Sequence, residues 1–162
     1  MRALLQRVNR ASVSLENGES RSIQRGLVVL LGIAPSDSEK DVNWLVEKIL
    51  NIRLFRKEGP EAKSSEFDLS IQDVQGELLI ISQFTLFADA RKGRRPDFTQ
   101  SAPPEKARSL YHLFVEMLRQ RFSRIATGEF GATMRVDIQN QGPVTILLDT
   151  ADVLPAAHNA PS

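Results

Sequence analysis

Hydrophobic and polar residues alternate at the start of the chain. Residues 2–8 and 11–16 show this period of two, which is typical of strands with one buried face. Asn17-Gly18 follows them, and this dipeptide favours a type I′ hairpin turn because both central residues of that turn need a positive φ. We therefore expect the chain to begin as an antiparallel pair of strands.

The next hydrophobic segment is continuous instead of alternating. Leu27 to Ile33 is apolar on both faces, which is typical of a central strand, and we expect helices to cover it. A first helix is predicted over residues 38–51, with Ser36 and Glu39 as a capping box. Its apolar residues recur at helical spacing: Val42, Leu45, Val46 and Ile49.

The second half of the chain returns to strands after one more helix. Polar residues interrupted by Gly and Pro make 56–76 a surface excursion before a strand at 77–82. Ser101 offers an N-cap to a longer helix that ends near Phe122. Its apolar stripe is Leu110, Phe114, Met117 and Leu118. Two further strands, 133–139 and 144–149, are expected on either side of residues 140–143.

This order of elements predicts a mixed α+β fold. We expect a single domain over residues 1–149, with a sheet or barrel-like core covered by two main helices. A length of 162 residues suits one hydrophobic core. The Ala- and Pro-rich residues 150–162 are predicted to form a flexible tail.

Composition excludes several kinds of site. The chain has no cysteine, which rules out disulfides, thiolate nucleophiles and Cys-containing zinc sites, and His112 and His158 are its only histidines. We expect no metal and no cofactor. The formal charge of +1 argues against bulk electrostatic coating of nucleic acid but leaves room for a local basic patch. No apolar run approaches the roughly 20 residues that span a bilayer, so we expect a cytoplasmic protein without a membrane partner.

Three segments carry candidate chemistry, although the usual nucleotide, metal and hydrolase motifs are absent from the sequence. One is the segment Ser82-Gln83-Phe84-Thr85-Leu86, which places an amide and two hydroxyls at a strand end. These groups either have a functional role or make local hydrogen bonds to the backbone. Gly142-Pro143 is either an ordinary turn or a rigid steric gauge. The third segment is a basic loop within residues 88–104, which suits either phosphate contacts or a solvated face; its cations are Arg91, Lys92, Arg94 and Arg95.

Two of these segments together resemble a known family. Ser82-Gln83-Phe84-Thr85-Leu86 and Asn140-Gln141-Gly142-Pro143-Val144-Thr145 are similar to the two signature motifs of the D-aminoacyl-tRNA deacylases. The resemblance extends over residues 1–149, including 1–8, 26–32 and 126–132. It departs from the family at residues 66–70, where many members carry a Met-Asn pair, and at Gln141, where an acidic residue is common.

The resemblance implies an activity and an assembly. Family members hydrolyse the ester between a D-amino acid, or mischarged glycine, and the 3′-terminal ribose of tRNA, a chiral proofreading step in translation quality control. They are cytoplasmic homodimers with the active site at the subunit interface, and a cis Gly-Pro of one subunit enters the pocket of the other. The partners implied for this chain are aminoacyl-tRNA, through its terminal adenosine and acceptor stem, and a second copy; no DNA is expected.

The same resemblance implies roles for particular residues. Gln83, Phe84 and Thr85 match the catalytic motif; we expect water to be the nucleophile, with backbone N–H groups around Gln83 and Phe84 as oxyanion donors. Ser82, Gly142 and Pro143 match the substrate-binding residues and the chiral filter, and Arg7 matches an arginine that holds the Gly-Pro in place.

Two other interpretations stay open at this point. The chain could be a catalytically silent tRNA- or RNA-binding module of the same fold. It could also be the relative that keeps the Gly-Pro in trans and removes L-alanine from the wrong tRNA.

Overall fold

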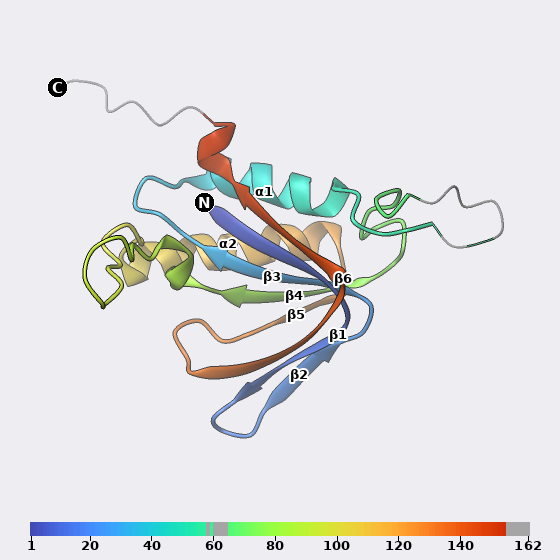
Figure 1. Cartoon of the computed structure of the whole chain (residues 1–162), viewed down its shortest axis with the longest axis horizontal. Helices are drawn as coiled ribbons and strands as arrows, with labels where there is room; N and C mark the ends of the chain where they lie inside the picture. Colours follow the sequence, from blue (N-terminus) through green and yellow to red (C-terminus); the bar gives the residue numbers. More distant parts are fainter. Residues whose placement is uncertain (58, 60–64, 155–162) are drawn as a thin grey trace.

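A computed structural model describes residues 1–57, 59 and 65–154. They form one α+β domain in which a six-stranded sheet curls into a nearly closed barrel with both helices on one side (Figure 1). In chain order the elements are β1 (Arg2–Leu15), β2 (Ser20–Ile23), β3 (Gly26–Gly32), α1 (Glu39–Asn51), β4 (Glu77–Ser82), η1 (Phe84–Phe87), α2 (Pro104–Arg121), β5 (Ile125–Thr127), β6 (Met134–Asp149) and η2 (Thr150–Asp152).

The central strands β3 and β4 run parallel and are buried on both faces. Leu27, Val29 and Leu31 face the helices and form the main core with them. Val28 faces the other way and packs in a second core with residues of β1, β2, β4 and β6. The expectation that helices cover the central strand is therefore correct for one face only, because the curled sheet itself covers the other.

β1 serves both cores because its pairing is interrupted midway. Ala3 and Leu5 point into the main core, whereas Val8, Ala11 and Val13 point into the second. Shifts in the register with β6 occur between Gln6 and Arg10, and an irregularity of this kind bends a strand and redirects its side chains. The two predicted segments, 2–8 and 11–16, are thus one strand, and its hairpin with β2 is confirmed. The turn is not of type I′, because only Gly18 of the pair Asn17-Gly18 has a positive φ.

β6 is likewise one strand of 16 residues, where two separate strands were expected. It pairs antiparallel with nearly the whole length of β1, from Arg2↔Asp149 to Leu15↔Met134. The far side of the barrel is held by a side chain, since Arg21 Nη1 of β2 donates to the Thr127 carbonyl of β5 at 2.8 Å. β5, η1 and η2 were not predicted because each is too short to show a hydrophobic period.

The helices match their predicted ranges but begin differently. α1 starts after Ser38, whose backbone N–H donates to Asp41 Oδ2 at 2.9 Å, so the capping pair is Ser38 and Asp41 instead of Ser36 and Glu39. α2 starts at Pro104, and Ser101 does not cap it. The buried residues of α2 are Tyr111, Phe114, Val115 and Leu118, whereas Leu110 and Met117 are half-buried.

The ordered chain continues past Asp149 into η2. Thr150 is 1% exposed, and its hydroxyl contacts the Asp41 carboxylate and accepts a 2.6 Å hydrogen bond from the Met1 ammonium. That ammonium also lies 2.7 Å from Asp37 Oδ1. These contacts join the two ends of the described chain to α1. The rest of the expected tail, residues 155–162 with His158, lies outside the described residues.

We predict that Thr150→Val lowers the free energy of unfolding by about 1–3 kcal/mol at pH 7, because it leaves the buried Met1 ammonium and the Asp41 carboxylate each one partner short. Urea denaturation measures this, with Thr133→Val, at an exposed position, as the control expected to stay within about 0.5 kcal/mol. An equal effect of the two changes would contradict the role given to Thr150.

The same contacts predict a pH dependence. Burial by itself raises the pKa of Asp41, but hydrogen bonds from Thr150 and Ser38 outweigh it and hold the pKa below the usual 3.8. A carboxylate with a lowered pKa stabilises the fold above its unfolded value, and that contribution is lost as the pH falls through the folded value. The difference in stability between wild type and Thr150→Val is therefore expected to shrink below about pH 4.

Candidate functional site

The first signature motif lies where β4 ends and the chain turns into η1. The Gln83 N–H donates to the Leu31 carbonyl at 2.8 Å, which anchors the turn to β3. This N–H is therefore already used, contrary to the expectation that donors around Gln83 are free. In the described part of the chain, nothing accepts from the N–H groups of Phe84 and Thr85, which leaves two adjacent backbone donors at the turn.

The Thr85 hydroxyl lies at the surface and contacts an amide. It accepts a hydrogen bond from Gln83 Nε2, and none of the described histidine or lysine side chains hydrogen-bonds to it. A threonine hydroxyl is a weak nucleophile unless a base takes its proton. The arrangement therefore orients Thr85 but does not activate it.

A hollow of about 500 Å³ opens beside this motif. Phe84, Phe98 and Phe130 give it aromatic walls, and the Phe84 and Phe98 rings meet edge to face at 4.9 Å between centroids. Ser101 also lines it, and its hydroxyl donates to the Phe84 carbonyl at 2.9 Å instead of capping α2. The remaining lining residues are Leu31, Ile33, Ser82, Gln83, Ala102, Pro103, Pro104, Ala107 and Gly131. A largely apolar wall with a few polar groups at one side is the usual form of a small-molecule site.

Sequence reasoning missed the residue that holds η1 in place. Arg2 Nη1 donates to the Leu86 carbonyl at 2.9 Å, while its Nε pairs with Asp149 Oδ2 at 2.7 Å. The guanidinium also lies 4.5 Å from the centroid of the Phe87 ring. Arg2 thus fixes the end of η1 against β6, and only the tertiary structure reveals this role.

The second signature motif is looped out of the sheet. Gln6 pairs with Thr145 and Val8 with Asn140, so two steps along β1 correspond to five along β6. The extra residues include Gly142 and Pro143, both exposed and joined by a cis peptide bond. Gly142 has φ +128°, and a Cβ there would lie 2.8 Å from Val144 Cγ2. This position therefore requires glycine.

Asn140 closes the base of this loop, which we call the Gly-Pro bulge (residues 141–143). Its Oδ1 accepts from the Val144 N–H at 2.9 Å, and its Nδ2 donates to the Val144 carbonyl at 3.2 Å and to Thr145 Oγ1 at 3.0 Å. One amide side chain therefore makes the hydrogen bonds that the looped-out backbone cannot make with β1. Asn140 belongs to the second signature motif, but the sequence alone gives no indication of this role.

Arg7 supports the bulge from behind and is 4% exposed. Its Nε donates to the Gln141 carbonyl at 3.2 Å, and its Nη1 donates to the Leu54 carbonyl at 2.8 Å. Glu66 accepts from Arg7 through its carbonyl and its carboxylate, both at 3.2 Å. The segment that departs from the family pattern thus contributes, through Glu66, to the placement of the bulge.

The two motifs do not meet within one chain. Ser82 lies beside Leu31, and Leu31 beside Ala3, whereas the bulge lies opposite Arg7. Four residues along β1 and three strand spacings lie between them, a path of roughly 20 Å along the sheet. One chain therefore carries both motifs at distant points of a rigid sheet.

The basic loop is a third, separate feature. Asp89 and Asp97 close it through a pair of 2.8 Å backbone hydrogen bonds, and the four cations lie exposed between them. Arg91 is paired with the Asp89 carboxylate at 2.6 Å, and hydrogen bonds from Arg91 lower the pKa of Asp89 to about 2. Lys92, Arg94 and Arg95 form no ion pair with any residue that the structure describes.

The described residues offer little to other ligand classes. No three His, Asp or Glu side chains among residues 1–57, 59 and 65–154 gather in a way that could hold a metal ion. His112 is exposed on α2 and meets the Tyr111 ring edge-on. None of the helices in this part of the chain has both the length and the hydrophobicity needed to cross a membrane.

Comparisons with known proteins agree on one family. The family model described as D-Tyr-tRNA(Tyr) deacylase matches residues 4–149. The D-aminoacyl-tRNA deacylase of Thermosipho melanesiensis is 47% identical over 154 residues, which are 94% of this chain and 99% of that protein. The protein of the same name from Caldicellulosiruptor saccharolyticus is 49% identical over 153 residues, which are 94% of this chain and 99% of the relative.

Solved structures share the fold. The structure named c-Myc DNA Unwinding Element Binding Protein superposes with a TM-score of 0.84 at 45% identity, covering 92% of this chain and 98% of that one. A probable eukaryotic D-amino acid tRNA deacylase superposes with a TM-score of 0.78 at 19% identity, covering 91% and 97%. From the match of nearly the whole chain to the family model and to these relatives, the chain belongs to the D-aminoacyl-tRNA deacylase family.

Proposed function

We propose that this protein hydrolyses the ester of D-aminoacyl-tRNA, and of glycine mischarged on tRNA, releasing free tRNA and the amino acid. Its family and the names of its relatives support the reaction class. The observation that carries the finer proposal is the Gly-Pro bulge, a piece of exposed main chain that Asn140 and Arg7 hold out of the sheet.

The hollow beside Ser82 is the site for the 3′-terminal adenosine and its ester. Its aromatic walls suit the flat faces of a base, and its volume of about 500 Å³ suits one nucleoside with an attached amino acid. The two free N–H groups, of Phe84 and Thr85, lie in the turn that borders this hollow. The ester carbonyl is therefore assigned to the Phe84 side of the hollow.

Two copies of the chain complete the site. Because a path of about 20 Å along the sheet lies between the bulge and the hollow of the same chain, the bulge acts in the hollow of a second copy. A two-fold dimer would use each motif twice, once on each subunit. Exposed apolar side chains support such a contact: Phe84 is 58% exposed on η1 and Leu147 is 53% exposed on β6.

The bulge selects chirality by excluding the L isomer. If the α-amino group and the ester are held in fixed places, an L side chain is driven into the Gly142-Pro143 main chain, whereas a D side chain points away. Main chain suits this task because a side chain could relieve the clash by adopting another rotamer. Each 1.4 kcal/mol of clash gives about tenfold discrimination. Glycine has no side chain, so this filter cannot reject it.

The chemical step uses water. The substrate's vicinal ribose hydroxyl assists the water, and the N–H groups of Phe84 and Thr85 stabilise the developing oxyanion, an effect often worth about 3 kcal/mol per donor. Thr85 accepts from Gln83, and none of the described histidine or lysine side chains is bonded to its hydroxyl to take the proton. Its side chain therefore supports the turn and does not attack the ester.

The basic loop meets the acceptor stem. Its cations are exposed between Asp89 and Asp97, and Lys92, Arg94 and Arg95 form no ion pair within the described residues. Lysine and arginine in such a position suit contacts to phosphate oxygens, which supply affinity without reading sequence. DNA is not the expected partner, because the family model and the relatives are named for deacylation of aminoacyl-tRNA.

The proposed function is tested by hydrolysis of matched D-tyrosyl-tRNA and L-tyrosyl-tRNA at equal enzyme and ester concentrations, with a buffer-only control. We expect rapid loss of the D ester, while the L ester decays at the buffer rate. If neither ester decays faster than in buffer while tRNA still binds, the protein is a silent tRNA-binding module.

Thr85→Ala is predicted to retain D-ester hydrolysis within about tenfold of wild type, because the change removes a hydroxyl but keeps the backbone N–H that binds the oxyanion. Single-turnover kinetics with D-tyrosyl-tRNA measure this directly. Complete loss of hydrolysis with tRNA binding intact would make Thr85 the nucleophile and overturn the water mechanism.

Asn140→Asp is predicted to weaken chiral selection more than it weakens activity. The aspartate still accepts from the Val144 N–H but cannot donate to the Val144 carbonyl or to Thr145, so the bulge is less firmly held. Loss of hydrogen bonds worth about 1 kcal/mol should lower the ratio of D to L rates by about fivefold. Asn43→Asp on α1 is the matched control, and an unchanged ratio in Asn140→Asp would refute the filter assignment.

A further inference from the structure

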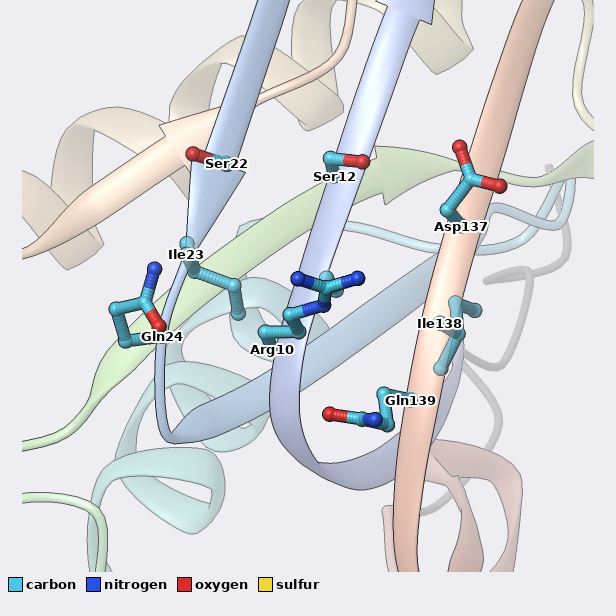
Figure 2. Close-up of a pocket in the computed structure, with 9 residues that line it drawn as sticks. Arg10, Ser12, Ser22, Ile23, Gln24, Asp137, Ile138 and Gln139 are labelled. Carbon is cyan, nitrogen blue, oxygen red and sulfur yellow. The ribbon is translucent and has the colours of Figure 1, made fainter.

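A second hollow, of about 590 Å³, lies on the outer face of the barrel, away from both helices. Figure 2 shows side chains from three neighbouring segments converging on it, with Arg10 of β1 between Gln24, just after β2, and Gln139 of β6. Ser12, Ser22 and Asp137 complete its polar lining. Neither signature motif contributes a residue to this hollow.

Most polar side chains of this hollow make no hydrogen bond or ion pair within the described residues. Within the described residues, the guanidinium of Arg10 has no ion pair or hydrogen bond, and neither do the side chains of Gln24 and Gln139. Asp137 is the one carboxylate in the lining, and it lies 3.6 Å from Arg135 Nε. A free guanidinium flanked by two amides and two hydroxyls is a set of donors that suits a phosphate diester.

The hollow adjoins the Gly-Pro bulge. Arg10 pairs with Gln139 across the two strands, and the next pair along the ladder is Val8 with Asn140, the residue that closes the bulge. Gln139 is three residues from Gly142, which limits their Cα separation to about 11 Å. Any ligand held at the tip of the bulge therefore has Arg10 and its neighbours among the donors nearest to it on this chain.

We propose that this hollow binds the phosphodiester backbone of the single-stranded 3′ end of the tRNA whose ester occupies the partner subunit's pocket. This inference rests on the proposed function, because that function places the terminal aminoacyl-adenosine beside the bulge. The nucleotides before the terminal adenosine must then leave along the surface next to the bulge. Arg10 takes a phosphate there, and the amides of Gln24 and Gln139 contact sugar or base edges.

The hollow and the basic loop suit different parts of a tRNA. The loop is a dense cluster of cations, which suits the closely spaced phosphates of a duplex stem. The hollow has a single free cation among amides and hydroxyls, which suits a few nucleotides of a single strand. The two features therefore contact different parts of the same tRNA.

Arg10→Gln tests the proposal with two D-tyrosyl esters, one of whole tRNA and one of adenosine alone, which has no phosphate. We expect the variant to raise KM for the tRNA ester by about tenfold and to reduce the salt slope of tRNA binding by about one, with hydrolysis of the adenosine ester unchanged. Arg119→Gln, an exposed arginine on α2, is the matched control and should match wild type with both esters.

Binding of deacylated tRNA separates this inference from the proposed function. Arg10→Gln should weaken binding of intact tRNA about tenfold but leave binding of tRNA trimmed of its single-stranded 3′ end unchanged, whether or not the ester is hydrolysed. Equal affinity of wild type and Arg10→Gln for intact tRNA, or an equal loss with trimmed tRNA, would overturn the proposal. If wild type hydrolyses neither ester, the proposed function fails, and the binding comparison still decides the role of Arg10.

Discussion

The hydrogen-bonded ladder between β1 and β6 determines how the other elements of the domain are placed. These two long strands run antiparallel over almost their full length, and the ladder holds both cores of the barrel together. The ladder is irregular only between Gln6 and Arg10, where β6 has more residues overall than β1 can match. Those residues are forced outward, and Asn140 and Arg7 make the hydrogen bonds that the ladder does not supply.

The same ladder keeps the two signature motifs apart. Arg2 fixes η1 and its free N–H groups at one end of β1, while Arg7 fixes the Gly-Pro bulge further along the same strand. The hydrogen-bonded strands between them are packed too rigidly to bend far enough to bring the two motifs together. We therefore propose that the two motifs act together only between two copies of the chain, which would make assembly a condition for chiral selection.

Hydrophobic period predicted the α+β class, both helices and the buried strand at Leu27–Ile33, because these features depend on local sequence. It divided β6 in two, since Gly142-Pro143 reads as a break although pairing continues on both sides of it. The signature residues were predictable from the resemblance. Three other features could not be predicted from the sequence, because each depends on residues that only the tertiary structure brings together. They are the hydrogen bond from the Gln83 N–H to the Leu31 carbonyl, the hydrogen bond from Arg2 to the Leu86 carbonyl, and the outer hollow.

Mixing two altered chains tests whether the bulge of one copy acts in the hollow of another. One chain has its hollow filled by Ala107→Trp, and the other keeps an open hollow but carries the loosened bulge of Asn140→Asp. With the filled chain in excess, each open hollow faces an unaltered bulge, and we expect wild-type preference for the D ester over the L ester. A preference that stays at the lower value of Asn140→Asp alone would show that each bulge acts on its own chain and would refute a site shared between two copies.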